Sequence, residues 1–65
     1  MLSEKIGKNA GLVWDALKDG ELNLKALKKV TKLTEKDLSY ALGWLAREGK
    51  VYFFEQADEF YVKLS

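Results

Sequence analysis

The chain contains no cysteine, no histidine and no proline among its 65 residues. Without cysteine it can form no disulfide, and without cysteine or histidine it lacks the ligands of the usual zinc sites. The absence of histidine also removes the side chain that most often transfers protons near neutral pH. A domain of this size buries only about 60% of the surface of its unfolded chain. Its stability must therefore come from packing or from self-association.

The sequence also lacks targeting and membrane segments. The N-terminal stretch MLSEKIGKN becomes polar at once and has no apolar core of a signal peptide. No stretch approaches the roughly 18 apolar residues of a membrane span. There is no repeat, low-complexity segment or linker. We therefore expect a single domain over residues 1–65, located in the cytoplasm, with no membrane partner.

Groups that could carry out catalysis are few. A nucleophile would have to be Ser3, Ser39 or a threonine, with no histidine to act as its base. The carboxylates fall mostly at expected helix starts and turns, where capping and solvation explain them. The sequence has no glycine-rich phosphate loop and no metal-ligand cluster. We predict a protein that is not an enzyme and that needs no cofactor, metal or small-molecule ligand.

The formal net charge of +1 conceals a local asymmetry. Residues 1–24 hold three lysines against four acids, and residues 51–65 hold one lysine against three acids. Between them, residues 25–47 hold five lysines and one arginine against two acids, which gives +4. The basic charge is therefore concentrated in the middle of the chain, around KKVTKLTEKDL at residues 28–38.

The first third of the chain predicts one helix. Ser3 is a suitable N-cap, and Asp19-Gly20 is a suitable stop. Between these signals the apolar residues recur at helical spacing, at Ile6, Ala10, Val13 and Leu17.

Two further helices are predicted in the basic middle of the chain. Asn23 can cap a helix from about residue 24 to residue 30, whose inward positions are Leu24, Leu27 and either Val30 or Thr31. Lys32-Leu33 forms the turn. Thr34 then caps a helix that ends at Glu48-Gly49, with acidic residues in its first turn, where the helix dipole favours them. Its apolar stripe is Leu38, Ala41, Leu42 and Leu45.

The hydrophobic period changes to two in the last third of the chain. Val51–Glu55 and Glu59–Leu64 predict two strands, joined by the turn Gln56-Ala57-Asp58. Glu21-Leu22-Asn23, before the second helix, is short and extended. The order of elements predicts an α+β fold of three helices with a C-terminal two-stranded β-hairpin.

Two stretches carry a resemblance to a known family. Residues 42–51, LGWLAREGKV, resemble the junction of third helix and wing in the winged helix-turn-helix superfamily. Together with IGKNAG at residues 6–11 and Val13-Trp14, they are similar to short stand-alone bacterial winged-helix proteins of uncharacterised function. The resemblance covers nearly the whole chain and implies a winged helix with the hairpin as its wing. It implies DNA binding and transcription regulation only indirectly, because fold does not dictate function.

The candidate DNA-binding surface lies on the second and third helices. If the third helix enters a major groove, its face opposite the apolar stripe would reach base edges or phosphates, and lysines of the second helix would line the flanking backbone. The candidates are Lys25, Lys28, Lys29, Lys32, Lys36, Ser39, Tyr40 and Arg47. The partner would be double-stranded DNA.

Several features weigh against this reading. The lysines could simply form a solvated face that keeps a small protein soluble. Lys28 occupies a position where DNA-binding helix-turn-helix motifs usually carry a small residue. Lys32 occupies the turn position that is often glycine in such motifs. Glu35 and Asp37 would lie near phosphates, and the wing tip at residues 55–59 holds no positive charge.

The alternative function is a protein interaction module without DNA binding. The hairpin carries aromatic residues on both faces, which a 65-residue monomer can hardly cover. Gly7 and Gly11 would let another backbone approach the first helix, although Trp14 and Trp44 could instead pack at the margin of the domain's own core. We expect a homodimer, with these candidate interface residues: Gly7, Gly11, Trp14, Trp44, Tyr52, Phe54 and Tyr61.

Overall fold

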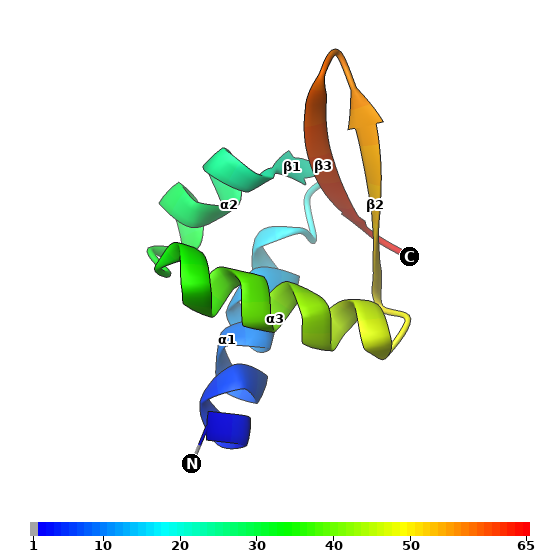
Figure 1. The fold of residues 1–65 in the computed structure, drawn as a ribbon. Helices are drawn as coiled ribbons and strands as arrows, with labels where there is room; N and C mark the ends of the chain where they lie inside the picture. Colours follow the sequence, from blue (N-terminus) through cyan, green and yellow to red (C-terminus); the bar gives the residue numbers. More distant parts are fainter. Residues whose placement is uncertain (1) are drawn as a thin grey trace.

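The computed structural model describes the backbone of residues 2–65 and the side chains of residues 4–65. Three helices precede a three-stranded antiparallel sheet of order β1-β3-β2 (Figure 1). The elements are α1 (Leu2–Ala16), β1 (Leu22–Asn23), α2 (Leu24–Thr31), α3 (Glu35–Arg47), β2 (Val51–Gln56) and β3 (Glu59–Leu64). This arrangement confirms the predicted α+β winged helix-turn-helix with a hairpin wing.

Helix α1 differs from its prediction at both ends. It begins at Leu2, so Ser3 lies inside the first turn and is not the N-cap; the Ser3 side chain is outside the described residues. It ends at Ala16 rather than at the predicted stop, because the chain tightens there. The N–H of Leu17 donates to the carbonyl oxygens of both Val13 and Trp14, each at 3.1 Å. Such a shared bond is common where a helix end narrows into a turn.

The predicted caps of α2 and α3 are confirmed. The Asn23 Oδ1 atom accepts a hydrogen bond from the N–H of Ala26 at 2.7 Å. The Thr34 hydroxyl accepts one from the N–H of Asp37 at 3.1 Å. Between the helices, Lys32 adopts the left-handed conformation, with φ 60°, and its N–H donates to the Lys28 carbonyl oxygen. The turn therefore uses the backbone conformation for which glycine is normally selected.

The sheet contains one strand more than the predicted hairpin. The short strand β1 pairs with β3 through Leu22 opposite Val62 and Asn23 opposite Tyr61. The hairpin itself is regular, with six successive residue pairs between β2 and β3. Its turn is shorter than predicted, because Gln56 belongs to β2. Ala57 and Asp58 alone form it, with φ of 54° and 65°.

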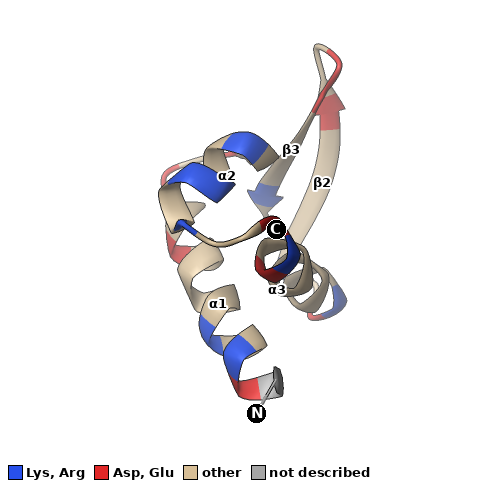
Figure 2. Cartoon of the chain, turned by 60° about the vertical axis from the view of Figure 1, so that its left-hand side comes forward, with Lys and Arg blue, Asp and Glu red and all other residues tan. Residues whose placement is uncertain are grey.

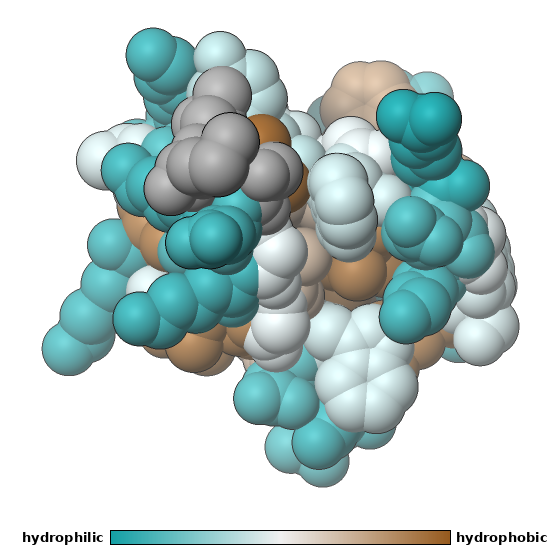
Figure 3. All heavy atoms as spheres, turned by 90° about the horizontal axis from the view of Figure 1, so that it is seen from below, coloured by the Kyte–Doolittle hydropathy of each residue, from teal (hydrophilic) through white to brown (hydrophobic). Residues whose placement is uncertain are grey.

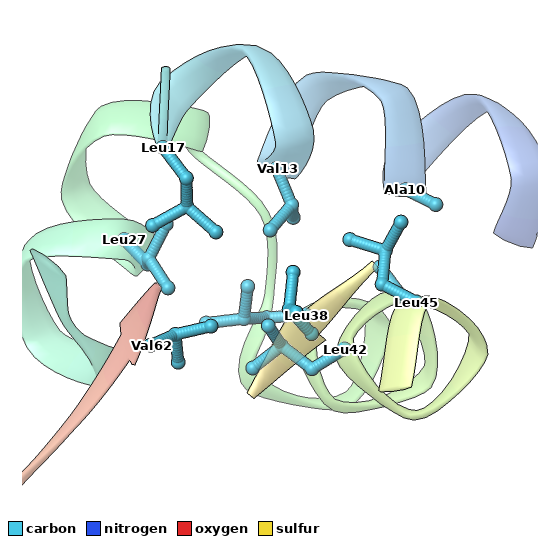
Figure 4. Close-up of a cluster of buried hydrophobic side chains, with 10 residues drawn as sticks. Ala10, Val13, Leu17, Leu27, Leu38, Leu42, Leu45 and Val62 are labelled. Atoms are coloured by element: carbon cyan, nitrogen blue, oxygen red, sulfur yellow. The ribbon is translucent and has the colours of Figure 1, made fainter. Parts of the chain in front are cut away.

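The core lies between α1, α2, α3 and the base of the hairpin (Figure 4). The predicted stripe of α3 is fully confirmed, as are three of the four core residues predicted for α1; Ile6 is only half-buried. The buried apolar residues are Ala10, Val13, Leu17, Leu27, Leu38, Ala41, Leu42, Leu45, Val51 and Val62.

Two residues of α2 were predicted wrongly or left open. Leu24 is 41% exposed instead of facing inward, although it is the first residue of α2 and directly follows β1. Of the two alternatives for the last inward position, Val30 is 59% exposed, whereas Thr31 is half-buried and its hydroxyl donates to the Leu27 carbonyl oxygen at 2.6 Å.

The hairpin extends beyond the body that the helices form (Figure 1). The molecule is elongated, with principal extents of 38 × 23 × 19 Å. The core therefore reaches only the base of the hairpin, where Val51 and Val62 are buried. Phe53 and Phe60 lie on the same face as these valines but stay 46% and 57% exposed. Phe60 lies nearer the tip, whereas Phe53 lies directly opposite Val62 on the edge strand β2. Within residues 2–65, no helix is both long enough and apolar enough to cross a membrane.

Candidate nucleic-acid and protein interfaces

The helix pair α2 and α3 presents all eight candidate DNA-binding residues to solvent. We refer to these eight as the basic surface: Lys25, Lys28, Lys29, Lys32, Lys36, Ser39, Tyr40 and Arg47. Lys25, Lys28 and Lys29 lie on α2 and Lys32 lies in the turn after it, while Lys36, Ser39, Tyr40 and Arg47 lie on α3. Figure 2 shows basic residues on α2 and at both ends of α3. The sequence therefore placed the basic charge correctly on these two helices and on exposed positions.

A groove of about 230 Å³ separates the two helices. Lys25 and Lys28 line it from α2, and Ser39 lines it from α3. The Ser39 hydroxyl donates to the Glu35 carbonyl oxygen at 2.9 Å, which leaves its lone pairs free to accept a hydrogen bond. The structure thus brings these three candidates together around one hollow.

The outer face of α3 separates its charged candidates along the helix axis. Lys36 lies in the first turn, with its Nζ atom 6.0 Å from the centre of the Tyr40 ring, within cation–π range. Arg47 lies in the last turn, about 16 Å further along at 1.5 Å per residue. A duplex on this face would therefore meet Lys36 with Tyr40 and Arg47 at two separate places.

The acidic residues near the basic surface do not behave alike. Asp37 turns toward α1, where its Oδ2 atom lies 3.4 Å from the Lys5 Nζ atom, and its side chain is only 22% exposed. Glu35 is exposed and lines the groove beside Lys25 and Lys28. Of the two acids in the first turn of α3, Glu35 is therefore the one placed beside the candidates on α2.

The wing tip carries acidic charge only. Glu55, Asp58 and Glu59 are exposed at the end of the hairpin, which Figure 2 shows as the acidic tip of β2 and β3. The hairpin offers one lysine, Lys63, which lies in β3 toward the base. The tip thus presents no cation to a phosphate.

A second groove, of about 400 Å³, lies between α1 and α3. We call it the tryptophan groove, because Trp14 and Trp44 line it and remain 38% and 40% exposed. Two other candidates, Gly7 and Gly11, lie along the same groove. Seen from the end where α1 begins, brown apolar atoms lie at the floor of a hollow between paler and polar side chains (Figure 3). The structure therefore gathers four of the seven candidate interface residues in one place.

Both tryptophans pack with one side against the domain. The Lys18 Nζ atom lies 4.8 Å from the centre of the Trp14 ring, and Leu45 of the core lies in the same groove. Trp14 and Trp44 are nevertheless 38% and 40% exposed. Packing at the margin of the core therefore buries part of each indole and leaves the rest exposed.

The other three candidates form an aromatic cluster on the outer face of the sheet: Tyr52, Phe54 and Tyr61. The Phe54 and Tyr61 rings are stacked, with centroids 5.5 Å apart, and the Tyr52 ring lies 6.2 Å from that of Phe54. Stacking leaves Phe54 and Tyr61 half-buried, whereas Tyr52 is 46% exposed. The three rings thus bury part of one another's surface.

The sequence did not single out Phe53 and Phe60 as surface residues. Alternation places both on the face that is buried at Val51 and Val62, and the sequence indicated only that aromatic residues on both faces of the hairpin could hardly all be covered. The exposure of Phe60 depends on how far the hairpin extends beyond the helices, and that of Phe53 on its place in the edge strand β2. They add two large apolar side chains to the exposed wing.

These features define the protein as a winged helix-turn-helix domain, with an exposed basic helix pair and an acidic, aromatic wing. Its sequence matches the model of one such family over residues 1–64. The chain belongs to this family, the winged helix-turn-helix domain DUF2582.

Relatives and similar structures agree with this assignment. The uncharacterized protein MJ1608 of Methanocaldococcus jannaschii is 32% identical over 63 residues, which cover 92% of this chain and 90% of that protein. The solution structure of BT2368 from Bacteroides thetaiotaomicron is similar with a TM-score of 0.87 and 31% identity, over 98% of this chain and 79% of that one. HlyU from Vibrio cholerae is similar with a TM-score of 0.81 and 28% identity, over 98% and 71%.

Proposed function

We propose that this protein binds double-stranded DNA, with α3 in the major groove and the lysines of α2 along the adjacent phosphates. A transcription-related role follows from this proposal. The observation that carries it is the basic surface, whose lysines and arginine are all exposed on the two helices of a helix-turn-helix. In this motif the second helix reads the groove while the first crosses the backbone.

The ion pair between Lys5 and Asp37 supports the proposal. It turns one of the two acids at the start of α3 toward α1, so the field around α3 is more positive than the sequence alone indicates. The acidic wing tip, in contrast, would repel DNA phosphates. We therefore propose contact through the helices and none through the wing.

The proposed roles divide between the two helices. Lys25, Lys28, Lys29 and Lys32 would neutralise phosphates, which gives affinity without sequence information. Tyr40 and Arg47 on α3 would alter the preference between sequences. Lys36 and Ser39 lie on the first half of α3, the part of a recognition helix that usually meets base edges.

The test is a titration of labelled mixed-sequence duplex at about 50 mM and about 200 mM salt. If about five phosphates are contacted, affinity should fall by roughly 500-fold between these conditions. Chemical shifts of α3 should change on binding at the lower salt. No change on α3 at the lower salt would leave the proposal without support.

A second candidate function is self-association as a protein interaction module. The observation that favours it is the exposure of large apolar residues outside the basic surface, above all Trp14, Trp44, Tyr52, Phe53 and Phe60. Apolar patches of this kind usually mark interaction sites. Light scattering at increasing concentration tests it, since a dimer would have twice the 7.4 kDa chain mass.

Other expectations stay proposals. We propose a single domain over residues 1–65, located in the cytoplasm and without enzymatic activity. The archaeal relative shows that similar proteins are not confined to bacteria, so we do not restrict the proposal to that source.

A further inference from the structure

Strand β2 has an open edge. The strand order β1-β3-β2 leaves β2 paired on one side only, and Figure 1 shows it at the outer side of the sheet, away from β1 and α2. Its backbone groups on the open side can therefore pair with another strand.

The hydrogen-bond pattern identifies the residues on this open side. The N–H of Ser65 donates to the Lys50 carbonyl oxygen at 3.0 Å, so Lys50 and Ser65 form a hydrogen-bonded pair just outside the hairpin. Such pairs alternate along an antiparallel ladder, so the bonds to β3 come from Tyr52, Phe54 and Gln56. The N–H and C=O groups of Val51, Phe53 and Glu55 consequently point to the open edge.

This edge carries one charged residue, Glu55, but lacks the other features that usually prevent pairing with another chain. Protective edges are short, or carry lysine, proline or a bulge. Strand β2 contains neither lysine nor proline, and its register with β3 runs without a bulge over all six residues. Tyr52 and Phe53, which flank the edge on both faces, are each 46% exposed.

We propose that a second copy of the chain pairs with this edge, β2 against β2 and antiparallel, with Phe53 on the two-fold axis. The proposal rests on the second candidate function, self-association, and is independent of DNA binding. It would join the two sheets into one continuous sheet across the dimer.

The register follows from the sequence of β2. With Phe53 opposite its own copy, Val51 lies opposite Glu55. All three residues whose backbone groups point to the open edge then lie opposite a strand residue of the other copy. A shift by two residues leaves one of them opposite a turn residue. A further shift toward the tip places Glu55 opposite Glu55, where like charges repel.

The side chains complement one another in this register. Tyr52 lies opposite Phe54 of the other copy on the outer face, so each aromatic cluster extends the other. The partner's acidic tip comes beside the turn after α3, since Gln56 lies opposite Lys50 and Arg47 is exposed nearby. Aromatic pairs directly across strands stabilise a sheet. The acidic tip and the basic residues near Lys50 would lie in the same region without being directly across from each other.

The experiment compares Phe53→Lys with Phe60→Lys by sedimentation velocity, up to about 1 mM because an interface of this size is small. Both residues are exposed phenylalanines on one face of the hairpin, but only Phe53 lies on the open strand. The wild type and Phe60→Lys should approach twice the 7.4 kDa mass, and Phe53→Lys should stay monomeric. Thermal unfolding of each variant checks that it is folded.

Hydrogen exchange and NMR identify the surface independently of any variant. In the dimer, the N–H groups of Val51, Phe53 and Glu55 should gain protection with concentration, while those of Tyr52 and Phe54 should be protected throughout. A mixed-label sample should show an intermolecular NOE between the Hα atoms of Tyr52 and Phe54. A wild type that is monomeric at the highest concentration would overturn the proposal. A dimer that persists in Phe53→Lys would also overturn it and would direct attention to the tryptophan groove. Neither result depends on whether DNA is bound.

Discussion

The Lys5 Nζ atom lies 3.4 Å from the Asp37 Oδ2 atom, and this ion pair ties α1 to the start of α3. The Asp37 side chain is 22% exposed and that of Lys5 is 60% exposed, so solvent screens the pair considerably. The ion pair contributes little free energy, but it fixes the orientation of the Asp37 side chain. It turns a carboxylate away from the basic surface at the helix end where DNA is proposed to bind.

Replacing Lys5 with methionine should lower the free energy of unfolding by about 0.5 kcal/mol, because the partly exposed pair is lost. Thermal unfolding followed by circular dichroism would show this as a small fall in Tm. The fall should vanish near 1 M salt, where the screening length is about 3 Å. Lys8→Met, one turn along the exposed side of α1, controls for charge loss. An equal effect of both variants would mean that the ion pair contributes nothing specific.

Lys32→Gly should stabilise the fold and weaken DNA binding at the same time. Lys32 has φ 60°, a conformation that costs a residue with a Cβ atom about 1 kcal/mol or more relative to glycine. A gain of about 1 kcal/mol would raise Tm by roughly 4–8 °C in a domain of this size. Affinity for duplex should fall despite the gain, since one phosphate contact is removed. A more stable variant with unchanged affinity would remove Lys32 from the proposed site.

Replacing Ala57-Asp58 with Asn-Gly should stabilise the hairpin. Both residues have positive φ, which a two-residue turn of this kind requires and which Asn-Gly adopts most readily. We expect a gain of about 1 kcal/mol in urea unfolding, since each unfavourable conformation costs of this order. The salt dependence of DNA binding should not change, because the wing tip is not proposed to touch DNA. A variant with a changed salt dependence would contradict that part of the account.

Gly11→Ala should stabilise the monomer. Gly11 lies within α1, and a Cβ atom added there would meet nothing within 4 Å apart from its chain neighbours and the nearby backbone of its own helix. Alanine is favoured over glycine in a helix by about 1 kcal/mol. Urea unfolding should therefore shift to higher concentration, and the dimer proposed through β2 should be unaffected. A loss of self-association in this variant would instead assign the contact to the tryptophan groove.

Much of this fold could be predicted from the sequence, because its signals are local. Asn23 and Thr34 cap their helices as expected, since a cap needs only a side chain and an N–H three residues on. The stripe of α3 followed from helical spacing. The eight exposed residues of the basic surface followed from the opposite face of the same helix and from the lysines of α2.

The rest depends on how elements meet in space. Leu24 has the spacing of a core residue, yet its side chain is 41% exposed at the start of α2. Phe53 lies directly opposite the buried Val62, but it stays 46% exposed because it is on the edge strand β2. The sequence places the Asp37 carboxylate near the proposed DNA, whereas the structure pairs it with Lys5 of α1. Neither the exposure of the first two residues nor the contact of the third follows from a spacing along the chain.

The central claim is that the lysines of α2 contact phosphates. The most direct measurement compares duplex affinity against salt for two double variants of equal net charge. Lys28→Gln with Lys29→Gln changes the basic surface, and Lys8→Gln with Lys63→Gln changes exposed lysines on α1 and β3. The account predicts that the first variant reduces the slope of log affinity against log salt by about 2, and that the second keeps the wild-type slope. Equal slopes in both variants, or no binding by the wild type at about 50 mM salt, would contradict it.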